Sequence, residues 1–197
     1  MKRLHTLLTM VAIAALSFTF TSCDEDEAIA YTLDGTWEGN IYVSHRWDGR
    51  YYDASHSYIY FDRDIYRNAR GYGYWVDEYR NAPWGSYIAN HISWKVRNRD
   101  IIVYFEEDDY EVTIYDYSLN DRYFEGYIYT YDNKKVSFSL RKTSSRNWDN
   151  YYYGWDYWGD YYWNDYYYYG KQNSVVDETR ATPHTLEKPE RVFHRRE

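Results

Sequence analysis

The chain has 197 residues, enough for one ordinary domain with extensions, and carries a formal net charge of −8 at pH 7. It contains 29 tyrosines and 9 tryptophans, so aromatic rings must replace leucines in much of the core. An acidic protein is not attracted to phosphate backbones, and the charge therefore excludes nucleic acid as the expected partner despite the many rings that could stack on bases.

Residues 1–22 are predicted to be a lipoprotein signal peptide. Two basic residues precede an apolar run from Leu7 through Phe20, which is too short for a membrane-spanning helix. The run ends in Phe20-Thr21-Ser22-Cys23, which resembles the lipobox of bacterial lipoproteins. The commonest lipobox has Leu, and then Ala or Ser, where this chain has Phe20 and Thr21. The resemblance implies that cleavage leaves Cys23 as a lipidated first residue.

Cys23 is the only cysteine, so it has no partner for an internal disulfide. A lipid anchor with more than one acyl chain would hold the protein at a membrane without spanning it. Residues 23–32 are predicted to be an acidic lipidated linker, because four acidic residues follow Cys23 directly. Such a run is typical of a solvated linker. It also resembles the export signal of Bacteroidota lipoproteins, which implies the outer membrane, facing the cell exterior. Under the enterobacterial sorting rule, Asp24 would instead imply retention at the inner membrane.

Alternation of apolar and polar residues predicts eight short strands. It is clearest from Ile92 to Arg141, where the period of two is the one that a half-buried strand requires. Turn signals such as Asp48-Gly49 separate the strands, and connections this short join antiparallel neighbours. The predicted strands cover Thr36–His45, Ser57–Asp62, Gly71–Tyr79, Ile88–Val96, Asp100–Phe105, Tyr110–Tyr117, Tyr123–Tyr131 and Lys134–Lys142.

Eight antiparallel strands leave two unpaired edges unless the last strand pairs with the first, and closure into a barrel is the usual remedy. The sequence therefore predicts an all-β protein with an eight-stranded antiparallel up-and-down barrel over residues 33–143. A sandwich of two sheets is the alternative. The interior of a barrel of this size is either filled by side chains or able to hold one small ligand.

Gly35-Thr36-Trp37 opens the first predicted strand, and Arg141 lies at the end of the last. This combination resembles the Gly-x-Trp motif and the closing arginine of lipocalins and the wider calycin group. The resemblance extends over residues 33–142 and implies that Arg141 packs over Trp37 where the barrel closes, as a cation–aromatic contact. Arg141 shares parity with the outward Ser137 and Ser139, so this contact requires a bend or an open barrel end.

The same segment looks more specifically like small lipocalin-like lipoproteins of gut Bacteroidota. The residues that carry this likeness are Asn81-Ala82-Pro83, Asn90-His91-Ile92 and Tyr117-Ser118-Leu119-Asn120-Asp121. It implies fold and location more than activity, because one fold serves many functions.

The alternation stops after Thr143. Residues 144–170 are a low-complexity segment of Tyr, Trp, Asp, Asn and Gly, for which neither strand nor helix is predicted. Residues 171–197 are polar and charged and are predicted to be a disordered tail. The many rings suggest an adhesive surface, in which the candidate contact residues are Trp148, Trp155, Trp158 and Trp163.

No catalytic residue, cofactor or metal is predicted. None of the six histidines has metal-ligand spacing to another histidine or to the cysteine, and for His45 and His56, which flank the first turn, structural or exposed roles are preferred over a metal pair. The acidic run 106–109 lacks the alternating ligands and glycine of a calcium loop and is interpreted as a solvated turn. No nucleophile elbow or phosphate-binding loop is found, so the protein is not expected to be an enzyme.

Two binding hypotheses remain, beside a purely structural role in the cell envelope. In the first, a small apolar ligand enters the barrel and is lined by Trp94, Phe105, Ile114, Ile128 and Phe138, each of which would serve equally as ordinary core packing. In the second, exposed Tyr and Trp side chains bind glycans or proteins, because flat rings stack on sugar faces and anchor interfaces. The sequence does not predict the oligomeric state.

Overall fold

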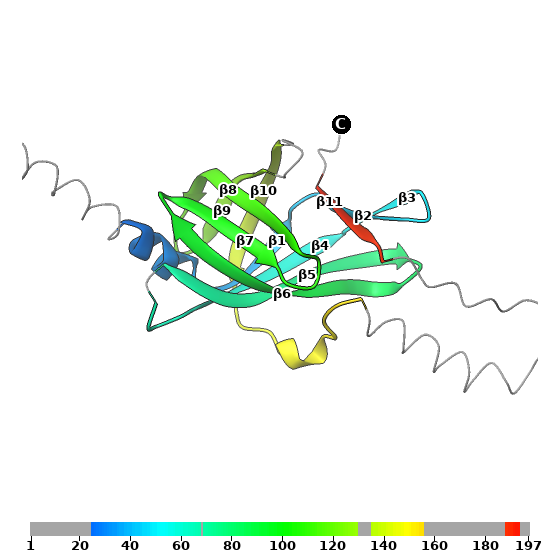
Figure 1. Cartoon of the computed structure of the whole chain (residues 1–197), viewed down its shortest axis with the longest axis horizontal. Coiled ribbons are helices and arrows are strands. Elements are labelled where there is room, and N and C mark those ends of the chain that lie inside the picture. The colour runs from blue at the N-terminus through cyan, green and yellow to red at the C-terminus, as the bar shows by residue number, and fades with distance from the viewer. Residues whose placement is uncertain (1–24, 68, 130–134, 156–187, 194–197) are drawn as a thin grey trace, which may run out of the picture.

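The predicted barrel strands form a closed antiparallel barrel in the computed structural model, which describes residues 25–67, 69–129, 135–155 and 188–193 (Figure 1). The eight-stranded barrel predicted from the alternation is confirmed, and the two-sheet sandwich is excluded, because the first barrel strand pairs with both the last and the second barrel strands. The barrel strands are β1 (Gly35–Asn40), β4 (His56–Arg63), β5 (Arg70–Ala82), β6 (Gly85–Arg97), β7 (Asp100–Phe105), β8 (Tyr110–Leu119), β9 (Tyr123–Tyr129) and β10 (Lys135–Thr143).

The barrel interior is packed with the inward side chains of every strand. Two tryptophans and four phenylalanines are among the largest fully buried residues, and their rings contact one another edge-on or tilted, as in the pairs Trp75–Phe105 at 5.0 Å and Trp37–Phe124 at 5.6 Å between ring centroids. Aromatic rings supply large buried areas, and such pairs add about 0.5–1.5 kcal/mol beyond the area that they bury. The core is thus aromatic, as the composition predicts.

The first predicted strand, Thr36–His45, is two strands in the structure. β1 ends at Asn40, whose side-chain Oδ1 accepts a hydrogen bond from the Tyr42 backbone N–H at 2.8 Å, and Tyr42 has a positive φ of 55°. A positive φ is unfavourable in a strand, so the chain leaves the barrel sheet here. β2 (Val43–Trp47) and β3 (Arg50–Asp53) follow as a hairpin outside the barrel.

The β2–β3 hairpin forms a separate three-stranded sheet with β11 (Glu190–Phe193), which pairs with β2 at one end of the barrel (Figure 1). Phe193 is 1% exposed and belongs to the barrel core. The prediction of a disordered tail over 171–197 is therefore wrong for β11, because this short strand contributes buried side chains to the barrel end. The remaining residues of that range, apart from 188 and 189, lie outside the described residues.

The opposite end of the barrel is covered by a helix over residues 25–33 (Figure 1). Ala30 and Leu33 are fully buried in the core, and the Leu33 backbone carbonyl accepts a 2.7 Å hydrogen bond from the Trp37 indole N–H. The acidic linker predicted for 23–32 is therefore wrong in its described part, which is a packed helix. The barrel unit extends on both sides beyond the predicted boundaries of 33–143, since it includes this helix and β11.

The segment after β10 runs along the outside of the barrel. It contains the short 3-10 helix η1 (Trp148–Asn150), in the yellow segment (Figure 1). Trp148 stacks on Tyr60 and Tyr74 with centroid distances of 5.8 and 5.5 Å. Trp148 is 8% exposed and thus buried against the outer face of β4 and β5. Within the described residues, no helix has the length and apolar character that crossing a membrane would demand.

Candidate functional site

The five residues predicted to line a ligand cavity all lie inside the barrel. Each is buried, from 0% exposed for Phe105 to 4% for Phe138, and all five belong to one core cluster with the other inward side chains, the set being Trp94, Phe105, Ile114, Ile128 and Phe138. Phe138 contacts Phe124 at 4.8 Å and Trp94 contacts Phe61 at 5.6 Å, measured between ring centroids. These side chains pack against each other, which is the arrangement of a filled core.

The cation over the closing tryptophan is Lys142, and the prediction that Arg141 packs there is wrong. Lys142 is the register partner of Trp37, and its Nζ lies 5.1 Å from the Trp37 ring centroid and donates to the Thr32 carbonyl at 3.1 Å. Arg141 follows the outward parity of β10 and instead pairs with Glu38, with its Nη2 2.5 Å from Glu38 Oε1. Trp37 itself lies at the closure between β1 and β10, as expected.

The tryptophans proposed as an adhesive tail have different positions. Trp148 is buried under the outer tyrosine stack, and Trp155 contacts Trp84 at 6.5 Å between centroids. Trp158 and Trp163 lie outside the described residues, as does Cys23, the proposed site of lipid attachment. Trp148 is therefore a packing residue of the barrel exterior and is not available as an exposed contact.

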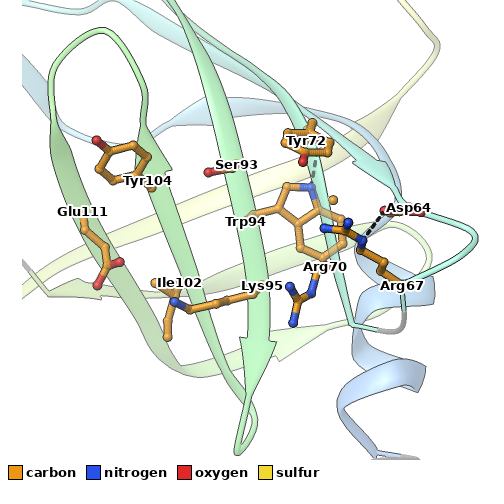
Figure 2. A pocket seen from close by; sticks show the side chains of 11 residues that line it. Asp64, Arg67, Arg70, Tyr72, Ser93, Trp94, Lys95, Ile102, Tyr104 and Glu111 are labelled. Carbon is orange, nitrogen blue, oxygen red and sulfur yellow. Dashed lines mark hydrogen bonds and ion pairs between the residues drawn. The ribbon is translucent and has the colours of Figure 1, made fainter.

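An open groove lies on the outer face of β5, β6, β7 and β8, with a volume of about 170 Å³ (Figure 2). Cross-strand pairing arranges its side chains in two adjacent rows. One row runs across the four strands as Tyr72, Ser93, Tyr104 and Glu111, and the next row contains Arg70, Lys95 and Ile102. We call this surface the outer groove. Asp64, Arg67, Gly71 and Trp94 complete its lining.

Two tyrosines stand on either side of a serine in the first row. Ser93 on β6 pairs with Tyr72 on β5 and with Tyr104 on β7, so a small hydroxyl side chain lies between two large rings. The Tyr104 hydroxyl donates to Asp109 at 2.8 Å, and this hydrogen bond raises the pKa of Tyr104, so its hydroxyl stays protonated at neutral pH. Trp94 fixes the wall beside Tyr72, because its indole N–H donates to the Tyr72 carbonyl at 2.8 Å. The result is a hollow with a polar floor and flat walls.

The second row brings two cations together. Arg70 and Lys95 are direct register partners on β5 and β6 and are both exposed. Within the part of the chain that the structure describes, neither side chain has a hydrogen bond or an ion pair, whereas the neighbouring Arg67 pairs with Asp64 at 3.8 Å (Figure 2). Like charges directly opposite each other destabilise a sheet, and so this arrangement needs another explanation than stability.

Two larger hollows flank Arg80, where the β5–β6 pairing becomes irregular. One has a volume of about 430 Å³ and lies next to β3, and the other has about 540 Å³ and lies beside Glu78. The side chains around the second are held within the fold, since Glu78 forms an ion pair with Arg146 at 3.5 Å and its carbonyl accepts from Ser55. The outer groove differs from both, because it lies on regularly paired strands and is lined by two tyrosine rings and by two cations without ion-pair partners in the described part of the chain.

A buried charged cluster lies at the β11 end of the barrel. The Arg191 guanidinium pairs with Asp77, donates to Asn90 at 2.5 Å, and lies 3.3 Å from Asp108. Asp77 Oδ1 also accepts from Ser57 at 2.6 Å and from the Trp75 indole at 3.0 Å. The carboxylates are fully engaged by donors from the protein, so the cluster is an ion-pair network that closes the barrel.

The pKa values of this cluster follow from its burial and charges. Burial lowers the pKa of His45 well below its usual value, and the positive charges of Arg191 and Lys188 lower it further, so the imidazole is neutral and paired with the Tyr79 hydroxyl. Burial alone would raise the pKa of Asp108, but Arg191 and Lys188 outweigh it and lower that pKa. The charges are thereby fixed in their paired forms at neutral pH.

The histidines and acidic residues form no metal site in the described residues, where no group of three or more His, Cys, Asp or Glu side chains could hold an ion. His45 is buried in the barrel end, whereas His56 lies beside Tyr58 at 4.6 Å between ring centroids. In the acidic turn, Glu107 bonds to His91 and Asp108 pairs with Lys188 at 2.8 Å. The turn is therefore tied into the fold, and the calcium alternative has no support in its geometry.

Sequence reasoning missed the outer groove. The alternation correctly places Ser93 and Lys95 on the outer face, but it does not reveal which residues of the neighbouring strands lie beside them. Only the register brings Arg70 opposite Lys95 and Ser93 between the two tyrosines. The turn at Asn98-Arg99 could have placed Tyr104 beside Ser93 and Ile102 beside Lys95, because a two-residue turn fixes the β6–β7 register.

Comparison with known proteins adds little to this description. Neither a protein family nor a curated protein matches the chain. Among solved structures, a redesigned β-barrel is similar with a TM-score of 0.37 and 14% sequence identity, over 59% of this chain and 96% of the other.

Proposed function

We propose that the protein is a lipid-anchored, non-catalytic binding protein of the bacterial cell surface, and that it binds glycans in the outer groove. The observation that carries the binding role is Ser93, which lies between Tyr72 and Tyr104 on three neighbouring strands. Flat rings stack on sugar faces, and a hydroxyl between them can exchange hydrogen bonds with sugar hydroxyls. Strands hold these side chains more rigidly than a loop would.

The size of the groove supports an extended ligand. Its volume of about 170 Å³ is well below the roughly 300–1,000 Å³ of pockets that enclose a whole small molecule. A hollow of this size, open on one side, suits one unit of a chain-like molecule whose remaining units lie along the surface. A polysaccharide has this form, and its repeated units add contacts along the barrel exterior.

The second candidate function, binding of an apolar molecule inside the barrel, has less support. Its proposed lining residues are already in contact with other rings, and Phe193 and Leu33 fill the two ends of the same core cluster. A ligand would have to displace packed side chains, at the cost that any loss of core contacts carries. An apolar fluorescent probe that binds with saturable stoichiometry would restore this hypothesis.

The cellular location of the protein is part of the same proposal. We propose that residues 1–22 are a signal peptide, that Cys23 carries the lipid, and that the protein is a lipocalin-like lipoprotein of Bacteroidota facing outward from the outer membrane. The support is the lipobox-like Phe20-Thr21-Ser22-Cys23 and the acidic run after it. Cells that express the chain should incorporate labelled palmitate into it, and Cys23→Ala should abolish the label. Protease added to intact cells should remove the protein; protection from protease would contradict the outward face.

The glycan proposal is tested by affinity electrophoresis of the purified processed protein in gels that contain soluble polysaccharides. Tyr72→Ala and Tyr104→Ala should each reduce retardation, because each removes one wall of the groove. One stacked ring contributes about 0.5–1.5 kcal/mol, so the dissociation constant should rise about twofold to twelvefold. Tyr123→Ala is the matched control, since Tyr123 is 54% exposed on β9, away from the groove. Equal losses in all three variants would show general adhesion by tyrosines and contradict a defined site.

A further inference from the structure

We infer that the ligand of the outer groove is an acidic polysaccharide, in which a carboxylate or sulfate group sits between Arg70 and Lys95. This inference rests on the proposed glycan-binding function and adds the chemical class of the ligand. Its starting point is that the two cations face each other directly across β5 and β6. An anion placed between them would turn a repulsive pair into two attractive contacts.

The absence of an internal counterion supports this assignment. The chain has 31 acidic residues against 23 basic ones, so carboxylates are plentiful. Arg67 pairs with Asp64, and on the opposite side of the barrel Arg141 pairs with Glu38. Arg70 and Lys95 have no such partner among the residues that the structure describes. In an acidic protein, two adjacent unpaired cations mark a place where the negative charge comes from outside.

The positions of the cations relative to the rings define how the ligand lies. Arg70 and Lys95 each stand two residues along the strand from Tyr72 and Ser93, on the same outer face. Successive outward residues of a strand are separated by about 6.5–7 Å, which is comparable to the reach from a sugar ring to its own carboxylate or sulfate oxygens plus a hydrogen bond. A sugar seated over Ser93 between the rings therefore directs its acidic substituent to the two cations.

The rest of the groove fits the same orientation. Ile102 is the register partner of Lys95 on its other side and offers an apolar surface to the ligand, while Glu111 stands beyond Tyr104. Figure 2 shows Glu111 at the far side of the groove from Arg70. The carboxylate of Glu111 would repel a second acidic group there and accept hydrogen bonds from neutral sugar hydroxyls. The groove thus distinguishes an acidic end from a neutral end of the bound sugar.

The test compares polysaccharides that share a backbone and differ in charge. Polygalacturonate is paired with its methyl-esterified form, and dextran sulfate with dextran, in affinity electrophoresis and calorimetry with the purified processed protein. We expect at least one acidic member to bind at least about tenfold more tightly than its neutral counterpart, because two charge-assisted contacts are lost in the neutral form. Higher salt should reduce this difference.

The double variant Arg70→Gln/Lys95→Gln should remove the preference for the acidic member, so that the dissociation constants of the acidic and neutral members come within about twofold of each other. Its matched control is Arg50→Gln/Arg122→Gln, which makes the same change in net charge at positions outside the groove. Unfolding midpoints of both variants should stay at the wild-type value or higher, which shows that a loss of binding is not a loss of folding.

The outcomes separate the two proposals. If Tyr72→Ala weakens binding of both members of a pair but Arg70→Gln/Lys95→Gln does not change their ratio, the acidic class is wrong and glycan binding stands. If no polysaccharide binds, both proposals fail. If the control double variant reduces binding as much as the groove variant, the attraction is general and the site is wrong. If free sulfate or galacturonate competes as well per anionic group as the polymer, the site takes a small anion and the polysaccharide is excluded.

Discussion

The N-terminal helix covers one end of the barrel and β11 the other (Figure 1). The helix inserts Ala30 and Leu33, whereas β11 inserts Arg191 and Phe193. The helix end is sealed by apolar side chains and by a hydrogen bond from the Trp37 indole to the Leu33 carbonyl. The β11 end is sealed around a buried guanidinium that needs Asp77 and Asp108 as partners. Both segments come from outside the eight-stranded sheet, and both fill its openings.

The two ends differ in the interactions that stabilise them. Burial of apolar groups is insensitive to pH and salt, and it contributes about 25 cal/mol for each Å² removed from water. A buried ion pair must first compensate for the desolvation of both charges, and it fails if either partner is lost or neutralised. The helix end should therefore respond mainly to packing changes, while the β11 end should respond to packing, to charge and to pH.

The largest effect is expected from Arg191→Met, which leaves Asp77 buried without its cation. The free energy of unfolding should fall by about 3–5 kcal/mol, because an uncompensated charge remains in the barrel end. Urea denaturation followed by tryptophan fluorescence measures this loss. Arg46→Met is the matched control, since Arg46 pairs with Glu190 between side chains that are each 52% exposed, and such surface pairs contribute about 0–1 kcal/mol.

The double variant Asp77→Leu/Arg191→Met sharpens the same prediction. Removal of both charges leaves neither Asp77 nor Arg191 as an unpaired buried charge, so the double variant should be more stable than Arg191→Met alone. The Ser57 hydroxyl and the Trp75 indole lose their acceptor in this variant, which limits the recovery. If the double variant is as unstable as the sum of two single variants, the pair is not the reason for the loss.

At the helix end, Leu33→Ala should lower the free energy of unfolding by about 2–5 kcal/mol, the range for large-to-small changes in a packed core. The distinguishing measurement is the pH dependence of this loss between pH 5 and 8, which should be flat because no charge is involved. A loss that changes with pH would connect this end to the charged cluster. Tyr31→Ala on the same helix is the control, as Tyr31 is 71% exposed.

A smaller effect comes from acidification at the β11 end. Burial keeps the pKa of His45 below its unfolded value of about 6.5, so the folded protein binds fewer protons than the unfolded chain below that pH. Stability is therefore fully present above pH 6.5 and is lost as the pH falls from 6.5 toward the folded pKa. The slope of this loss is at most about 1.4 kcal/mol per pH unit for a single group.

Chemical denaturation at several pH values measures this loss, and His45→Gln should flatten the profile over the same range. His91→Gln is the control, because His91 lies on the outer face beside Tyr153 and Glu107. A second decline is expected as the pH falls below about 3.8, where the lowered pKa of Asp108 makes its protonation costly to the fold. A profile that is flat between pH 8 and 5 in the wild type would contradict the role of His45.

The same two ends show what can be predicted from the sequence. The barrel is predictable because alternation over eight runs is a local property, and the turns between them are short. β11 is not, since Arg191 and Phe193 are two inward residues in a charged segment, and their partners lie on β5 and β7. One signal was present: Asp77 has the inward parity of Trp75, and a carboxylate at an inward position implies a buried partner.

The N-terminal helix and the outer groove were hidden for different reasons. The acidic residues before Ala30 make the helix look like a charged linker, although Glu25 and Asp26 bind the turn between β6 and β7. Glu25 pairs with Arg99 at 3.3 Å, and the Asp26 carboxylate accepts from the Arg99 backbone N–H at 2.7 Å. The groove depends on register, which converts correctly predicted outward residues into neighbours. Periodicity identifies the face of a residue, and only pairing identifies what lies beside it.

The smallest effect is expected at the barrel closure, where two adjacent cations on β10 have opposite parity. Lys142→Gln should lower the free energy of unfolding by about 1 kcal/mol, because it removes the cation near the Trp37 ring and the hydrogen bond to the Thr32 carbonyl of the helix. Arg141→Gln should cost about 0–1 kcal/mol, as its side chain is 71% exposed and pairs with Glu38 at the surface. High salt should diminish the effect of Arg141→Gln more than that of Lys142→Gln, whose contacts are less exposed. A larger loss for Arg141→Gln would mean that the arginine stabilises the barrel closure, as the lipocalin resemblance implies. It would also contradict the contribution of Lys142 to the stability of the helix end.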